Sequence, residues 1–273
     1  MSFDSPVEKH YHREGLYDTI INKLNEIGIT VVTRKDISGV DEFHIRGAAV
    51  SQELAGEASF HRNAAVLDVG CGLGGPCRML AEEYGCNVTG IDLTEEFIQT
   101  AEQLTKLVKM EDKVHFLQAD ALQLPFENES FDFAWTQHVQ MNIEDKKTFY
   151  AEIYRILKPG GRFIYYDVLS ADQTPLYFPV PWADDASISF LISAFTLHAL
   201  LTGLGFIKIQ TKDQTPAGLE FFEELLDKMS RGENPKIGLP LLIGVTSKQK
   251  FANLYRNLKE GKMEIQSGIY QKN

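Results

Sequence analysis

The chain has 273 residues and a mass of 30.8 kDa, which allows one or two domains with a buried core. Hydrophobic residues make up 44% and charged residues 24%, which excludes wholesale disorder and fibrous folds. With 27 basic and 38 acidic residues the net charge is −11, which disfavours nucleic acids and anionic membranes as partners.

The cysteines and the N-terminus point to a reducing compartment. Three cysteines, at positions 71, 77 and 86, are too few for a disulfide framework and lack zinc-site spacing. The first 15 residues contain no apolar core of a signal peptide. Residues 186–207 carry no charge, but serines, threonines and glycines interrupt them, so we expect a buried helix and a strand there. We therefore expect a cytoplasmic protein that holds no metal and does not enter a membrane.

The first two-thirds of the chain alternate between helical and strand patterns. Apolar spacing predicts helices over 16–28 and 47–58, followed by a buried strand over 64–69. Further strands are predicted over 87–92, 113–118, 131–136 and 162–168, with helices between them and a turn at 158–161. This alternation predicts a parallel sheet covered by helices on both faces.

The last third continues this pattern with one interruption. A proline-containing loop over 174–182 leads to a helix over 193–204 and a strand over 205–212. Amphipathic helices are predicted over 217–230 and 247–259, before a final strand over 263–271. Residues 213–260 thus separate the last two strands, and we expect them to lie over the ends of the sheet as a lid.

A glycine-rich loop follows the first predicted strand. Gly70, Gly72 and Gly75 match the spacing G-x-G-x-x-G, and Gly74 adds a fourth glycine. Such glycines permit a tight strand-to-helix turn and a close approach of a ligand to the backbone. The same spacing occurs in dinucleotide-binding enzymes, so the loop alone does not identify the ligand.

Three aspartates close successive predicted strands beside this loop. Asp68 ends the first strand, Asp92 the second and Asp120 follows the third. The carboxyl ends of parallel strands share one edge of a sheet, where ligands bind. Carboxylates there repel a pyrophosphate and attract the sulfonium and ammonium of S-adenosylmethionine (SAM). We expect Asp92 to bind the ribose hydroxyls and Asp120 the adenine amino group.

These motifs resemble those of the class I SAM-dependent methyltransferases. Asp68-x-Gly70-x-Gly72, Gly90-Ile-Asp92, Gln118-Ala-Asp120 and Leu157-Lys-Pro-Gly-Gly161 carry the resemblance over residues 64–168. It implies an α/β fold with a Rossmann-like, doubly wound sheet of seven strands, the last antiparallel. It also implies cofactor contacts from the following residues: Asp68, Gly70, Gly72, Gly74, Asp92, Leu93, Asp120, Ala121, Thr136 and Gln137.

A nearer similarity is to small-molecule methyltransferases of the sarcosine/dimethylglycine and ubiquinone-biosynthesis type. Trp135-Thr-Gln-His138, Met141-Asn142 and Pro179-Val-Pro-Trp182 carry it. It implies that an N-terminal helical segment, residues 1–60, closes over a methyltransferase domain at residues 61–273 whose lid is the 213–260 insertion.

The acceptor is expected beside the fourth strand. His138 either removes a proton from an acceptor hydroxyl or ammonium or serves in binding or packing. Asn142 either orients the acceptor or caps the helix that contains Asp145. Near the N-terminal segment, His44 and Arg46 are candidates for substrate binding, Arg46 through a carboxylate of SAM or of an amino-acid-like acceptor. Trp182 belongs to a possible aromatic wall with Phe178, Pro179 and Pro181, which could equally be a packed loop.

The predicted activity is methyl transfer from SAM to a small-molecule amine or hydroxyl by direct displacement, yielding S-adenosylhomocysteine. Positioning of the reactants would supply most of the catalysis, and no metal is needed. Two alternatives stay open: a non-catalytic SAM-binding partner subunit and an NAD-dependent oxidoreductase. Methylation of nucleic acid is disfavoured by the acidic charge. The expected state is a monomer or a homodimer.

Overall fold

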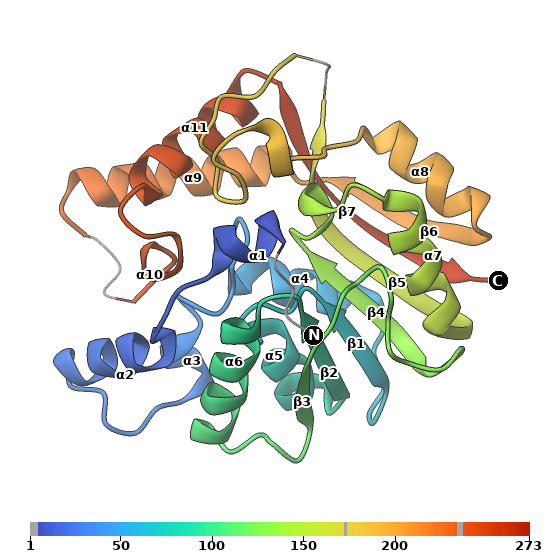
Figure 1. Cartoon of the computed structure of the whole chain (residues 1–273), viewed down its shortest axis with the longest axis horizontal. Helices are drawn as coiled ribbons and strands as arrows, with labels where there is room; N and C mark the ends of the chain where they lie inside the picture. The colour runs from blue at the N-terminus through green and yellow to red at the C-terminus, as the bar shows by residue number, and fades with distance from the viewer. Residues whose placement is uncertain (1–4, 172–173, 234–236) are drawn as a thin grey trace.

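Seven strands form a single sheet in the order β3-β2-β1-β4-β5-β7-β6. The computed structural model describes residues 5–171, 174–233 and 237–273 (Figure 1). The strands are β1 (Ala65–Val69), β2 (Asn87–Asp92), β3 (Val114–Gln118), β4 (Phe131–Gln137), β5 (Leu157–Ser170), β6 (Phe206–Asp213) and β7 (Met263–Lys272).

Strand direction divides the sheet into two parts. The pairs β1–β2, β1–β4, β2–β3 and β4–β5 are parallel, whereas β7 runs antiparallel to both β5 and β6. This confirms the predicted seven-stranded sheet with an antiparallel last strand. It also confirms that the carboxyl ends of β1 to β5 meet at one edge.

Helices cover both faces of the sheet. They are α1 (Pro6–Tyr11), α2 (Leu16–Glu26), α3 (Arg34–Ile37), α4 (Ala48–Ala58), α5 (Gly75–Tyr84), α6 (Glu95–Leu107), α7 (Lys146–Ile156), α8 (Ala194–Gly203), α9 (Thr215–Ser230), α10 (Pro240–Ile243) and α11 (Ser247–Lys259), with single 3₁₀ turns at Gln140–Asn142 and Ala186–Ile188. In Figure 1, α7 and α8 lie at the β5–β6 side of the sheet, and α9, α10 and α11 gather near α1.

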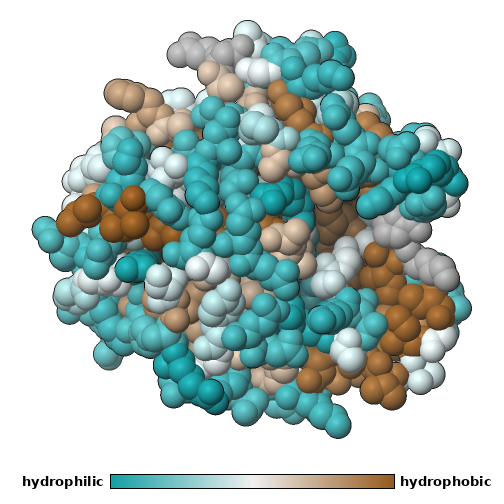
Figure 2. Space-filling model, turned by 180° about the vertical axis from the view of Figure 1, so that it is seen from behind, coloured by the Kyte–Doolittle hydropathy of each residue, from teal (hydrophilic) through white to brown (hydrophobic). Residues whose placement is uncertain are grey.

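Alternation along the strands builds a core on each face. In β1, Val66 packs into one hydrophobic cluster and the next residue, Leu67, packs into the opposite one. The first cluster contains residues of α4, α5, α9 and α11, and the second contains residues of α7 and α8. Both faces of the central strands are therefore buried, as a parallel sheet requires. Figure 2 shows the outer surface from behind, where most residues are hydrophilic.

One predicted segment takes a different form in the structure, and another forms the expected helix and strand. Residues 158–161, predicted as a turn before the fifth strand, lie inside β5 as an irregularity, because pairing with β4 jumps from Phe131–Leu157 to Phe133–Arg162. The uncharged stretch 186–207 contains a 3₁₀ turn, α8 and the start of β6. Among the described residues, no helix combines the length and apolarity needed to cross a bilayer.

Candidate active site

One cavity collects residues from the carboxyl ends of four parallel strands. Its lining includes Gly70 and Gly72 after β1, Asp92 and Leu93 at the end of β2, Asp120 and Ala121 after β3, and Gln137 and His138 at the end of β4. These residues lie far apart in the sequence and meet because parallel strands end at one edge. The structure thus brings together most of the residues predicted for the cofactor.

The glycine loop after β1 is shaped by close packing against the loop after β4. Gly70 has φ 77°, and a Cβ at this position would lie 2.4 Å from Cγ2 of Val139. Only glycine avoids both the backbone strain and this clash. The backbone amides of Gly70 and Cys71 donate to the carbonyl of Ile91, at 2.8 and 2.9 Å. The loop is therefore tied to β2 and held open toward the cavity.

Asp92 links the glycine loop to the next helix. Its Oδ2 accepts from the amide of Gly72 at 3.0 Å, and its Oδ1 accepts from the amide of Thr94 at 2.9 Å. Burial raises the pKa of Asp92, and these backbone amides oppose the rise. Each carboxylate oxygen can accept a further hydrogen bond. Asp92 is thus a fixed acceptor that suits a ligand with hydroxyl groups.

The other two predicted aspartates occupy different positions. Asp120 lines the same cavity, and its Oδ1 accepts from the amide of Leu122 at 2.8 Å. Asp68 lines a smaller adjoining cavity with Gly70, Gly72 and Gln137. The Cys77 thiol donates to Asp68 Oδ2 at 3.1 Å, and burial raises the pKa of Asp68 to about 7. A cationic ligand nearby would favour its ionised form.

Three predicted site residues do not line these cavities. Gly74 is the N-cap of α5, where a Cβ would meet the ring of Phe116 at 2.4 Å. Thr136 is buried within β4. Arg46, expected to pair with a ligand carboxylate, instead donates to Glu53 Oε2 at 2.8 Å and to Gln214 Oε1 at 2.9 Å. Its guanidinium is thus engaged by the chain itself.

His138 lies at the centre of a cluster of three aromatic rings. It stacks on Tyr166 with ring centroids 5.2 Å apart, and the ring of His44 lies 6.1 Å from each of them. Its backbone has φ 53°, and its amide donates to the carbonyl of Tyr166 at 2.8 Å. Burial and the neighbouring His44 lower the pKa of His138 well below the ordinary value. The imidazole is therefore neutral near pH 7 and able to accept a proton.

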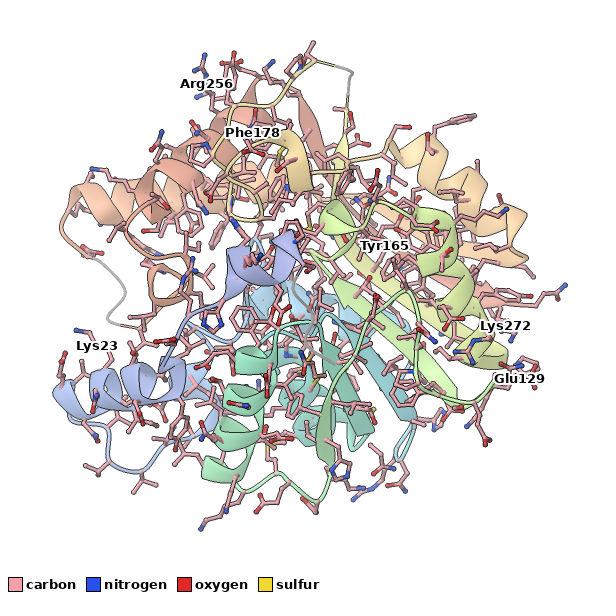
Figure 3. The ribbon with its side chains drawn as sticks, in the orientation of Figure 1. Lys23, Glu129, Tyr165, Phe178, Arg256 and Lys272 are labelled. Atoms are coloured by element: carbon pink, nitrogen blue, oxygen red, sulfur yellow. The ribbon has the colours of Figure 1, made fainter. Side chains whose placement is uncertain are left out.

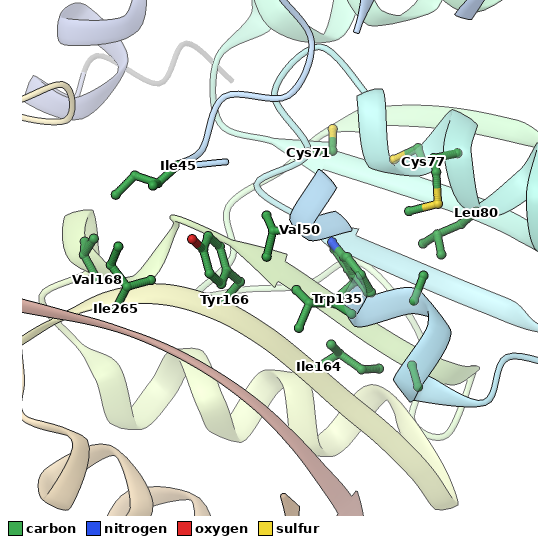
Figure 4. Packing of buried hydrophobic residues seen from close by; sticks show 14 of the residues in the cluster. Ile45, Val50, Cys71, Cys77, Leu80, Trp135, Ile164, Tyr166, Val168 and Ile265 are labelled. Atoms are coloured by element: carbon green, nitrogen blue, oxygen red, sulfur yellow. The ribbon is translucent and has the colours of Figure 1, made fainter. Parts of the chain in front are cut away.

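Four buried polar atoms around this cluster have no hydrogen-bond partner in the described part of the chain. They are His44 Nδ1, Gln137 Nε2, His138 Nε2 and the Tyr166 hydroxyl. In Figure 4 the Tyr166 hydroxyl points toward the segment that carries Ile45. Buried polar atoms normally find partners, so this group suits the polar parts of bound molecules.

A hydrogen-bond network behind the cavity orients two of these groups. His44 Nε2 lies 2.9 Å from Glu42 Oε2, which also accepts from the Ser51 hydroxyl at 2.7 Å. The Gln137 side-chain oxygen accepts from Trp135 Nε1 at 2.9 Å and from Ser51 at 3.2 Å, which turns the amide nitrogen away from them. Glu42 and Ser51 were not predicted from the sequence, because no motif or spacing links them to the strand ends.

Asn142 lines the cavity, but protein groups occupy its amide. Its Nδ2 donates to the carbonyls of Trp182, at 3.0 Å, and Ile188, at 2.8 Å, and its Oδ1 accepts from the Tyr11 hydroxyl at 2.9 Å. It therefore joins α1 to the loop after β5. The predicted alternative role as a helix cap is wrong, because Asp145 caps α7 by accepting from the amide of Thr148 at 2.9 Å.

Asp167 holds the loop that carries His138. Its Oδ2 accepts from the amides of Val139 and Gln140, each at 3.1 Å. Burial raises its pKa to about 7, against the effect of these amides. No motif in the sequence indicates this role of Asp167, because it depends on β4 and β5 being neighbours.

The remaining wall of the cavity is hydrophobic. Residues of the 213–260 insertion contribute Phe221, Phe222 and Leu225 from α9 and Phe251 and Leu254 from α11. Trp182, placed in the predicted aromatic wall, lines the cavity, and its Nε1 donates to the Ser189 hydroxyl at 3.0 Å. Phe178 lies on the loop beside α11 and does not line the cavity (Figure 3).

Sequence comparisons agree with this arrangement. The model of a methyltransferase domain family matches residues 67–165, which contain the glycine loop, Asp92, Asp120 and His138. The 2-methyl-6-phytyl-1,4-hydroquinone methyltransferase of Synechocystis sp. is 37% identical over 55% of this chain and 49% of that protein. The glycine/sarcosine/dimethylglycine N-methyltransferase of Actinopolyspora halophila is 26% identical over 78% of this chain and 36% of that protein. The chain thus spans half or less of the length of these curated relatives.

A solved structure shows the same fold over nearly the full chain. Phosphoethanolamine N-methyltransferase 2 of Haemonchus contortus, in complex with S-adenosyl-L-methionine, aligns with a TM-score of 0.73 at 19% identity, over 93% of this chain and 60% of that one. Residues 67–165 thus match a methyltransferase domain family, and the strand order and the alignment show that the chain shares the fold of this solved methyltransferase.

Proposed function

We propose that the protein transfers a methyl group from SAM to a small-molecule acceptor. The observation that carries this proposal is the convergence of the glycine loop, Asp92, Asp120, Gln137 and His138 on one cavity. When bound, SAM supplies an activated methyl group and leaves as S-adenosylhomocysteine.

The residues present fit this cofactor. Asp92 offers carboxylate oxygens for the ribose hydroxyls, and Asp120, with Leu93 and Ala121 beside it, suits the adenine end. The unpartnered Gln137 Nε2 is a donor for the methionine carboxylate. Asp68, behind the glycine loop, adds negative charge toward a cation. A dinucleotide would place its pyrophosphate beside these carboxylates, at an electrostatic cost.

The chain's own residues have two tasks in the reaction. The first is to hold the acceptor in line and to exclude water, which for well-oriented reactants contributes up to about 7–11 kcal/mol. Helices α9 and α11 of the insertion would do this by closing over the acceptor. Helix α1, which supplies Val7 and Tyr11 to the cavity, would close over it too. The second is to take up a proton, for which the neutral His138 is the candidate.

Ligand titration tests the proposal directly. Isothermal titration calorimetry with SAM, S-adenosylhomocysteine and NAD should show binding of the first two and none of NAD. Incubation with methyl-labelled SAM and a metabolite mixture should then yield a labelled product. Binding of NAD in place of SAM would refute the proposal, and SAM binding without turnover of any acceptor would favour a non-catalytic partner subunit.

The cellular setting follows from the same proposal. The three cysteines are free, and the net charge is −11. We infer an enzyme of the reducing cytoplasm that acts on small molecules rather than nucleic acid, as a monomer or a homodimer. No group of three or more His, Cys, Asp or Glu side chains in the described residues is placed to hold a metal.

A further inference from the structure

The acceptor side of the cavity differs from the cofactor side in its chemistry. The carboxylates that line the cavity, Asp92 and Asp120, both lie at strand ends on the cofactor side. The opposite wall is apolar and aromatic, with large side chains from three separate segments: Trp182, Phe221, Phe222, Leu225, Phe251 and Leu254. Burial of a hydrocarbon surface against this wall is favourable because it removes apolar area from water.

No lysine or arginine of the described residues lines the cavity. The nearby cations are engaged elsewhere: Arg46 by Glu53 and Lys250 by Asp184, at 2.8 and 2.9 Å. A carboxylate or phosphate on the acceptor would therefore be buried without a cationic partner, which is costly. This argues against amino-acid-like and phosphate-bearing acceptors.

Among the described residues on the acceptor side, His44 and His138 line the cavity with an unpartnered ring nitrogen each, whereas Tyr11 and Asn142, which also line it, bond each other. His44 Nε2 bonds the Glu42 carboxylate, and its Nδ1 is buried and unpartnered. The unpartnered His138 Nε2 also faces this side, and the unpartnered hydroxyl of Tyr166, whose ring stacks on His138, lies beside it. Such a set matches a single hydroxyl, which donates one hydrogen bond and accepts another.

From these observations the structure assigns to this site an uncharged, hydrocarbon-rich acceptor that presents one hydroxyl, such as an alkyl-substituted phenol, to His138. This inference rests on the proposed methyl transfer and narrows it. The hydroxyl oxygen forms a bond to the methyl carbon while the carbon–sulfur bond breaks and its electron pair stays on sulfur. The hydroxyl proton passes to His138 Nε2, and the product is a methyl ether.

The test compares acceptors of different chemistry under the same conditions. Methyl-labelled SAM would be incubated with the protein and para-octylphenol, phenol, sarcosine, dimethylglycine or phosphoethanolamine. We expect a labelled methyl ether from para-octylphenol at a rate at least about tenfold above the others. Calorimetry with para-octylphenol and the S-adenosylhomocysteine-loaded protein gives a second readout that does not depend on turnover.

A matched pair of variants on α9 locates the hydrocarbon-binding wall. Leu225 lines the cavity, whereas Leu226 is 44% exposed and does not. Leu225→Arg should weaken para-octylphenol binding by about tenfold or more and leave SAM affinity within about twofold. Leu226→Arg should change neither, which controls for the added charge and for folding.

The outcomes separate this inference from the proposed function. Methylation of sarcosine or phosphoethanolamine without para-octylphenol would overturn the acceptor class and leave SAM-dependent transfer standing. A product methylated on carbon would overturn the role of the hydroxyl. If SAM binds, no acceptor turns over and para-octylphenol fails to bind the loaded protein, the inference is wrong. If SAM itself does not bind, the proposed function fails first.

Discussion

Replacement of His138 by alanine tests whether its imidazole accepts the acceptor's proton. His138 Nε2 is buried and unpartnered, and the lowered pKa keeps the ring unprotonated at neutral pH. Loss of a positioned base lowers kcat by about 10²–10⁴-fold. At about 1.4 kcal/mol for each factor of ten, this is roughly 3–5 kcal/mol of transition-state stabilisation. SAM affinity should stay nearly unchanged, because Asp92, Asp120 and Gln137 are intact.

The structure also predicts a cost in stability for this variant. His138 has φ 53°, where alanine is strained, and the Tyr166 ring loses its stacking partner. His138→Asn is the matched control, because asparagine tolerates a positive φ but is a poor base. Both variants should lose kcat, whereas His138→Ala should also lower the melting temperature.

The pH profile separates a base from a positioning residue. A base must be deprotonated, so wild-type kcat should stay constant as pH falls to the ordinary histidine pKa of 6.5 and decline only below it. In His138→Ala the deficit should shrink as pH rises, because more acceptor ionises in solution. If the variant instead raises KM and its profile parallels that of the wild type, His138 only positions the acceptor. A His138→Ala variant with the kcat, KM and melting temperature of the wild type would refute both roles.

Three further predictions concern the cofactor side and the lid. Asp92→Ala removes the acceptor for the amides of Gly72 and Thr94. It should weaken SAM binding by roughly 1–3 kcal/mol in calorimetry. Unchanged SAM affinity in a folded variant would refute the assignment of Asp92 to the ribose. Burial raises the pKa of Asp68 to about 7, so its carboxylate ionises as pH rises through that value. The affinity for cationic SAM should therefore increase from about pH 6 to pH 8. The Asp68→Asn variant should abolish this pH dependence. Hydrogen exchange in α9 and α11 should slow when SAM and acceptor are both bound, whereas equal protection would make these helices a structural appendage rather than a lid.

Short-range patterns in the sequence already determined the frame of the site. The glycines that follow the first strand must form a tight turn, and the aspartates that close successive parallel strands must meet at one sheet edge. Asp92 and Asp120 accordingly line one cavity with Gly70 and Gly72, as predicted. These features depend on local backbone geometry and on strand order, and both leave a periodic signal in the chain.

Tertiary packing alone decided the acceptor side. Arg46, in the loop before α4, donates a hydrogen bond to Glu53 of α4. No pattern in the sequence predicts this contact. The apolar wall likewise depends on the packing of helix α9, which places Phe221 and Leu225 in the same cavity lining as Trp182. The amphipathic pattern of α9 shows only that one side of the helix is buried. An amphipathic pattern records burial but not the partner, because apolar contact is non-directional, and only the folded chain shows what each buried face covers.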